Sequence, residues 1–268
     1  MLRGLLLCLL VLYGGQLLAQ AEDASDLDQV WNQLLQRHVQ WSQGGHASTV
    51  DYDGLAGERE RLQAYLRSLS AIPEAEFRGW PAPRRASFLI NAYNAWTVEL
   101  ILQADTRPAS IKDLGGWLST PWRQPLVQLF GQTLSLDEVE HERLRGDPEQ
   151  RDPRIHFAVN CASIGCPALR PEAFRSEQLD AQLADQTQRF LGDRSRNHLD
   201  GSVLRVSPIF KWYAEDFERG WRDQHSVVDF LAAHAGALGL TSAQADQLRS
   251  GALRLRYSDY DWRLNSDD

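Results

Sequence analysis

The sequence predicts an α+β fold, built as a helix-rich single domain with a small antiparallel sheet. Segments with apolar residues at helical spacing outnumber short alternating segments, and the two kinds do not alternate as in a parallel βαβ series. The nine tryptophans are spread from Trp31 to Trp262, which indicates one core formed by the whole chain. No linker rich in Gly, Ser or Pro divides residues 22–268, so they are predicted to be one domain.

Helices are expected where apolar residues recur at intervals of three and four. In chain order these segments are residues 27–41, 55–69, 86–103, 135–144, 171–191, 208–217 and 227–234. The helix over 86–103 is so apolar that we expect it to be buried on most sides. The helix over 135–144 begins at a capping box, in which Ser135 and Glu138 bond each other's backbone N–H groups.

Short strands are expected where apolar and polar residues alternate, or where a β-prone run ends in a turn. In chain order they are residues 50–52, 127–130, 133–134, 155–161, 202–206 and 253–257. The alternation over 155–161 favours a strand, although a helix is not excluded at this length. On the strand prediction His156 and Asn160 share one face, with Cys161 on the opposite face or at the strand exit.

The first 21 residues have the pattern of a secretory signal peptide. Arg3 supplies the positive charge, Leu5 to Tyr13 is apolar, and Ala19-Gln20-Ala21 is an A-x-A cleavage pattern. The apolar run is far shorter than the ~20 residues of a membrane-spanning helix. We therefore expect a periplasmic or secreted protein with no integral membrane segment after cleavage.

The charge pattern argues against nucleic acid and anionic membranes as partners. The formal net charge is -8 at pH 7. Arginines are scattered along the chain, and the two lysines, Lys112 and Lys211, form no basic stripe. The expected partner is instead an unknown small-molecule or peptide ligand, and no cofactor is predicted.

The residues suited to chemistry are concentrated between Asp152 and Leu169. Cys161 and Cys166 lie there with His156 and Asn160. A thiolate nucleophile needs a lowered pKa, which an imidazolium can supply, and an amide can orient the imidazole. Backbone amides of the loop between the cysteines are candidates for an oxyanion hole. The same two cysteines can equally form a disulfide, because disulfides persist in exported proteins.

His141 is the second candidate, because Glu138-x-x-His141 has a carboxylate–histidine spacing that is found in metal sites. A solvated or core-edge histidine paired with Glu138 is the more ordinary interpretation. Zinc bound by His141, His156 and a cysteine is conceivable, but no ligand pair has the usual short spacing, so no metal ligand is predicted.

Three further residues are candidates for binding. Asn91 and Asn94 lie on a polar stripe of the apolar helix over 86–103. They either hydrogen-bond nearby loop backbone or face a cleft, and buried amides need partners in both cases. Lys211, in the segment Phe210-Lys211-Trp212-Tyr213, is a candidate cationic clamp.

Several segments resemble the domain-of-unknown-function 547 family. The matching segments include Phe88 to Val98, Ser135 to His141, the NCASIGCP run from Asn160 to Pro167, and Tyr260-Asp261-Trp262. The resemblance places His141, His156, Asn160, Cys161 and Cys166 in family motifs. The family has no assigned general activity. Some eukaryotic members carry a glutaredoxin-like domain as well, which is consistent with thiol chemistry.

Two functions follow from these residues. In the first, Cys161 is the nucleophile of a hydrolase or acyl transferase, His156 or His141 is its base, Asn160 is the orienting or oxyanion residue, and Cys166 is the reserve nucleophile. In the second, the protein is a non-enzymatic periplasmic binding domain with a Cys161–Cys166 disulfide. A zinc-binding domain is a variant of the second function.

Overall fold

The computed structural model describes residues 27–116 and 119–267, and the predicted signal peptide over 1–21 lies outside them. The helices are α2 (Gln29–His38), α3 (Tyr52–Gly57), α4 (Arg59–Ser70), α5 (Glu74–Arg78), α6 (Ala82–Leu102), α7 (Leu179–Gly192), α8 (Ile209–Trp212), α9 (Ala214–Glu218), α10 (Val227–Ala233) and α11 (Ser242–Arg249). A π-helix spans Glu138–Leu144, so the helix predicted from the capping box is present and ends where expected. None of the helices in the described ranges combines the length and apolar character needed to cross a membrane.

The strands form three small sheets. They are β1 (Val39–Ser42), β2 (Ala47–Val50), β3 (Val127–Leu129), β4 (Gln132–Leu134), β5 (His198–Asp200), β6 (Val203–Val206) and β7 (Arg254–Tyr257). The β1–β2, β3–β4 and β5–β6 pairs are antiparallel, which confirms the α+β prediction. The β6–β7 pair is parallel, because α8 to α11 connect the two strands and return the chain to the same end.

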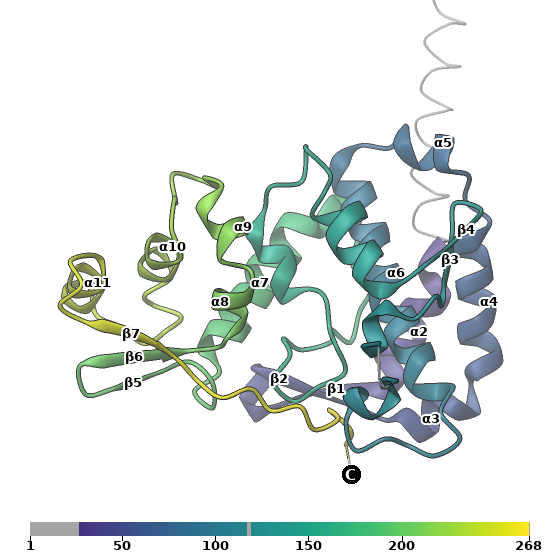
Figure 1. Ribbon diagram of the computed structural model, residues 1–268, viewed down its shortest axis with the longest axis horizontal. Coiled ribbons are helices and arrows are strands. Elements are labelled where there is room, and N and C mark those ends of the chain that lie inside the picture. The colour runs from purple at the N-terminus through teal and green to yellow at the C-terminus, as the bar shows by residue number, and fades with distance from the viewer. Residues whose placement is uncertain (1–26, 117–118, 268) are drawn as a thin grey trace, which may run out of the picture.

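The apolar side chains form two clusters that are separate in the structure. The first surrounds α6, whose side chains from Ala86 to Ile101 are all buried, as its composition predicted. The second lies under the β5–β7 sheet, α8 and α10. Figure 1 shows these two parts, with α2 to α6 on one side and β5 to β7 with α8 to α11 on the other. The domain boundaries 1–21 and 22–268 stay predictions.

The strand predicted over 155–161 is wrong. Pro153–Phe157 is a 3₁₀ helix, and all five residues are buried. Pro153 stands in its first turn, and the Asp152 carboxylate caps it by accepting from the Arg154 N–H. Alternating polar and apolar residues indicate a strand only when one face of the sheet is exposed to solvent. This segment is buried on every side, so its alternation did not indicate a strand. His156 and Asn160 therefore do not share a strand face.

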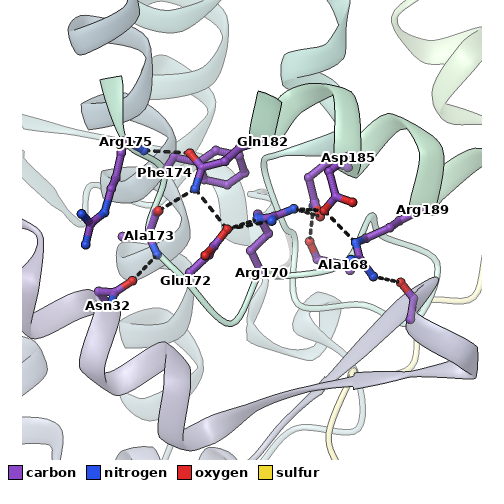
Figure 2. A network of polar contacts seen from close by, with 12 residues as sticks. Asn32, Ala168, Arg170, Glu172, Ala173, Phe174, Arg175, Gln182, Asp185 and Arg189 are labelled. Carbon is purple, nitrogen blue, oxygen red and sulfur yellow. Dashed lines mark hydrogen bonds and ion pairs between the residues drawn. The ribbon is translucent and has the colours of Figure 1, made fainter. Parts of the chain in front are cut away.

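The helix predicted over 171–191 begins only at Leu179. A short 3₁₀ helix, Ser176–Gln178, comes directly before it. Figure 2 shows how the residues upstream of this turn are held by side chains. The backbone N–H of Ala173 donates to Asn32 Oδ1 at 3.0 Å, and that of Arg175 donates to Gln182 Oε1 at 2.9 Å. Side chains from α2 and α7 thus replace the carbonyl acceptors that a helix would supply.

The C-terminal segment after β7 connects the two parts of the molecule. It leaves the β5–β7 sheet and runs to the β1–β2 hairpin, where Ser266 forms a bridge with Val50. On the way Leu264 forms an antiparallel bridge with Ser163, in the loop between the two cysteines. This path places Tyr260 and Trp262 beside Cys161 and Cys166, about a hundred residues away in sequence.

Candidate functional site

Cys161 and Cys166 are joined by a disulfide bond. The Cys161 backbone N–H also donates to the Cys166 Sγ at 2.8 Å. Cys166 is buried, whereas Cys161 is partly exposed. The sequence alone was compatible both with a nucleophilic Cys161 and with a disulfide between the two cysteines. In the disulfide form neither sulfur is a thiolate, so the nucleophilic role predicted for Cys161, with Cys166 in reserve, applies only to a reduced state.

A buried arginine organises the loop between the cysteines. The Arg196 guanidinium donates to the carbonyl oxygens of Ile164 at 2.9 Å and Gly165 at 2.9 Å, and to that of Cys166 as well. Asp193 holds the same guanidinium in an ion pair at 2.7 Å. Three loop carbonyls, which would otherwise lack a donor in a buried position, are therefore satisfied by one side chain.

The C-terminal segment packs against the other side of this loop. The Gly165 N–H donates to the Asp261 carbonyl at 2.8 Å, and a Cβ added at Gly165 would lie 2.9 Å from both that oxygen and the Tyr260 ring. Glycine is therefore required here by close approach. The Tyr260 hydroxyl lies 3.1 Å from the sulfurs of Cys161 and Cys166 alike. Burial raises the pKa of Tyr260, so the hydroxyl stays protonated.

Three of the loop amides that were candidates for an oxyanion hole donate to groups within the protein. The Ala162 N–H donates to Asn160 Oδ1 at 2.9 Å, the Ile164 N–H to the Arg263 carbonyl at 2.8 Å, and the Cys166 N–H to the Ser163 carbonyl at 3.0 Å. Each of these donors is thus engaged inside the protein, and none is directed at a space that a developing oxyanion would occupy.

The asparagines predicted near the site tie backbone segments to each other. Asn160 Nδ2 donates to the Pro167 carbonyl at 2.7 Å, which closes the disulfide loop at its base. Asn94 on α6 accepts from the Asn160 N–H at 2.8 Å and donates to the Ala158 carbonyl at 3.0 Å. Asn91, one turn earlier, makes the same pair of bonds to Phe174. Both asparagines of the polar stripe therefore hold loop backbone, and only Asn94 does so next to Cys161.

His156 is fixed by an acidic partner that the sequence did not single out. Its Nε2 lies 2.6 Å from Asp216 Oδ2, and Arg145 Nε donates to the same oxygen at 2.6 Å. Burial alone would raise the pKa of Asp216, but the bonds from His156 and Arg145 outweigh it and the pKa is lowered. Asp216 is therefore an ionised acceptor, and the His156 Nε2 carries a proton. The imidazole also stacks on the Tyr213 ring, with the ring centroids 3.9 Å apart.

Glu140 comes from the π-helix and lies on the other side of His156. Its Oε1 is 3.8 Å from His156 Nδ1, and neither atom has a hydrogen-bond partner among the described residues. Burial raises the pKa of Tyr213, and the carboxylate of Glu140, which accepts the Tyr213 hydrogen bond, raises it further. A π-helix widens one turn, and such turns recur at functional sites. Here the turn buries Glu140 while its neighbour His141 stays exposed.

These groups border one cavity of about 200 Å³. Cys161, Cys166, His156 and Glu140 all line it, together with Asp137. Its walls are largely aromatic: Tyr93, Trp122, Trp212, Tyr213, Tyr260 and Trp262. The cavity lies between the two apolar clusters, because Val159 belongs to the first and Ile209 to the second. An apolar pocket with a few convergent polar groups is the usual form of a ligand site.

The remaining predicted residues lie outside this cavity lining. His141 is exposed, its Nδ1 is 2.6 Å from an Arg145 nitrogen, and its Nε2 is 3.9 Å from Asp137. The expected pairing with Glu138 is absent, because Glu138 accepts from Ser135 in the capping box. Lys211 is exposed and does not line the cavity, so the position of the predicted clamp is not supported. The other lysine, Lys112, lies 3.9 Å above the Trp262 ring.

The donor set does not fit a zinc site. Within the described ranges no three His, Cys, Asp or Glu side chains are grouped so that they could hold a metal ion. His141 is engaged by Arg145, His156 by Asp216, and both sulfurs are in the disulfide. The sequence alternative of zinc held by His141, His156 and a cysteine is therefore not assembled.

The comparison with protein families finds one match. Residues 77–191 match the model described as protein of unknown function, DUF547. This match supports the DUF547 family. The matched segment carries α6, the π-helix, the disulfide loop and most of α7. No curated protein and no solved structure matches the chain.

Several functional side chains lie outside that matched segment and were missed by sequence reasoning. Asp216, which bonds His156, was not among the predicted site residues, and neither were Tyr260 and Trp262 of the cavity lining. Their neighbour Asp261 pairs with Arg263. The one available signal was the grouping of aromatic residues around Asp216 and Tyr260. Their distance from Cys161 in sequence hides the contact.

Proposed function

We infer that this DUF547 protein is an exported ligand-binding domain whose site is the aromatic cavity beside the Cys161–Cys166 disulfide. The observation that carries this proposal is the combination of stacked aromatic walls with two buried polar atoms, Glu140 Oε1 and His156 Nδ1, which lie 3.8 Å apart and have no hydrogen-bond partner in the described structure. Buried polar groups are normally satisfied. A ligand that supplies the missing hydrogen bonds is the simplest way to complete this site.

Binding is favoured over nucleophilic catalysis by the state of the cysteines and their surroundings. The sulfurs are joined, and the Tyr260 hydroxyl covers both of them. The loop amides and Asn160 are engaged in holding the backbone. An exported protein lives where such a disulfide persists, which agrees with the signal-peptide pattern over 1–21.

The test is a ligand screen that uses two matched surface variants. Trp212 and Tyr257 are both large, exposed side chains, at 47% and 39%, and only Trp212 lines the cavity. Fragments of neutral, acidic and basic character are screened by saturation-transfer NMR against the wild-type protein. We expect bound fragments to be lost in Trp212→Ala and retained in Tyr257→Ala. A screen in which nothing binds, or in which Trp212→Ala binds every fragment unchanged, overturns the proposal.

A second candidate is a cysteine-dependent hydrolase or acyl transferase that is active only after reduction. The observation in its favour is that both sulfurs line the same cavity as His156 and Glu140. Cys161, the more exposed sulfur, would be the nucleophile, and His156, oriented by Asp216, would be the base. Asn160 would act only through the loop backbone that it holds.

Iodoacetamide labelling across pH, after reduction with dithiothreitol, tests this candidate. It predicts a Cys161 thiol that labels with a pKa below the ~8.5 of a free cysteine. It also predicts that His156→Gln raises that pKa while His141→Gln does not. Labelling of reduced wild-type protein that follows an ordinary thiol pKa removes the second candidate and leaves the binding proposal standing.

A further inference from the structure

Two side chains of the cavity lining each carry a buried polar atom without a hydrogen-bond partner among the described residues. Glu140 is 4% exposed, and the atom on it is Oε1. His156 is 2% exposed, and its Nε2 proton is directed at Asp216, so in the neutral ring Nδ1 offers a lone pair. The two acceptor atoms are 3.8 Å apart, which lets one donor group reach both.

The walls favour a positive charge. The Trp212, Tyr260 and Trp262 rings are packed in contact, with centroids of Tyr260 and Trp262 4.4 Å apart and those of Trp212 and Trp262 5.9 Å apart. Aromatic faces attract cations, and tryptophan does so most strongly. Trp262 already carries the Lys112 ammonium 3.9 Å above its ring. The other carboxylate in the lining, Asp137, adds negative charge, partly balanced by Arg123 at 3.4 Å.

We propose that the cavity binds a primary alkylammonium group. This inference rests on the binding function proposed above and names the class of ligand. The ammonium donates to Glu140 Oε1 and His156 Nδ1, and its alkyl chain packs between the aromatic rings. A neutral ligand adds no positive charge beside the buried carboxylate of Glu140, and an anion meets two carboxylates, Glu140 and Asp137. A quaternary ammonium fits the rings but has no N–H for the two acceptors.

Three probes of matched size and one larger lysine derivative separate these possibilities. The probes are n-butylammonium, tetramethylammonium, n-butanol and Nα-acetyl-L-lysine methylamide, which presents the same butylammonium on a peptide unit. Binding to the full chain with its disulfide intact is measured by isothermal titration calorimetry. We expect n-butylammonium to bind about tenfold or more tightly than n-butanol, because its hydrogen bond to Glu140 involves two charges. Tetramethylammonium should bind more weakly than n-butylammonium.

Two glutamates on the same π-helix supply the matched variants. Glu140→Gln removes the buried charge, whereas Glu142→Gln removes an exposed one. We expect Glu140→Gln to abolish the preference for n-butylammonium over n-butanol, and Glu142→Gln to keep it. Circular dichroism and retained n-butanol binding show that Glu140→Gln is folded.

The outcomes separate this inference from the proposed function. Equal affinity for n-butylammonium and n-butanol, or the same preference in Glu140→Gln and Glu142→Gln, overturns the alkylammonium proposal even if fragments bind the cavity. That result would also indicate that His156 and Glu140 neutralise each other. Tight binding of the lysine derivative supports a peptide lysine as the source of the group, and binding of n-butylammonium alone supports a free amine. If none of the four probes binds, the alkylammonium proposal is overturned, and the proposed function is overturned with it only if the fragment screen also finds no ligand.

Discussion

Replacement of Asn94 by leucine is the sharpest test of how the disulfide loop is held. Asn94 is 2% exposed, and it makes two bonds to loop backbone, from the Asn160 N–H at 2.8 Å and to the Ala158 carbonyl at 3.0 Å. Leucine has a similar volume but can make neither bond. Each buried group left without a partner destabilises the fold by about 1–3 kcal/mol. The two together predict a loss of about 2–6 kcal/mol in the free energy of unfolding.

Asn91→Leu is the matched control, because Asn91 is fully buried on the same helix and makes the corresponding two bonds to Phe174. Urea unfolding followed by circular dichroism measures both variants. For a chain of this size each kcal/mol corresponds to about 2–4 °C in melting temperature, so both should melt at least about 4 °C lower. Only Asn94→Leu should also speed reduction of the disulfide by dithiothreitol, since only Asn94 is bonded next to Cys161.

A change of less than about 0.5 kcal/mol in Asn94→Leu would refute the reasoning, because surface substitutions already reach that size. Equal acceleration of disulfide reduction in both variants would instead show that Asn94 has no local effect on the loop. The sequence alone left two interpretations of this residue, loop support and cleft lining. The geometry makes it a loop support, and the paired variants measure that role.

Three further predictions concern stability. Burial raises the pKa of Asp28 to about 6 in the folded protein, whereas the unfolded chain loses this proton from about pH 4. Stability should therefore fall as pH rises from 4 to 6. Asp28→Asn should remove that fall in melts recorded at several pH values. Gly165→Ala should destabilise by about 1–3 kcal/mol, because its Cβ meets the C-terminal segment. Gly57→Ala, which meets nothing within 4 Å, should be neutral or stabilising in the same urea experiment. Replacing Cys161 and Cys166 by alanine should lower stability by roughly 2 kcal/mol, as expected for a short closed loop, and an unchanged urea midpoint would contradict a disulfide in the native protein.

Local sequence signals predicted much of the helical part of the fold. The helix over 86–103 and its burial follow from an apolar run with few charges, and α6 matches both. The capping box at Ser135 and Glu138 correctly marked a helix start, because those two side chains satisfy each other's backbone at short range. The π-helical winding was not predictable, since it depends on how Glu140 and Leu144 are buried against the rest of the molecule.

The errors occurred where side chains distant in sequence hold the backbone. The start of the helix predicted over 171–191 is replaced by bonds to distant side chains. The backbone N–H groups of residues 173, 174 and 175 donate to the side-chain oxygens of Asn32, Asn91 and Gln182. The sequence did not predict α5, α11 or β5, and it placed β1 inside the helix expected over 27–41. All four are short, and α11 and β5 pack within the second apolar cluster, which no local window contains.

The sequence by itself determined which residues could take part in chemistry: two cysteines, His156 and Asn160 in one short segment of a chain with a net charge of -8. Only the tertiary structure decided how they are used. It joins the cysteines, assigns Asp216 to His156, brings Glu140 to 3.8 Å from the same ring, and covers the sulfurs with Tyr260. The reason is physical, because hydrogen bonds and ring contacts depend on distance in space. The chain brings residues from 140 to 260 within that distance only when the two apolar clusters and the C-terminal segment have packed.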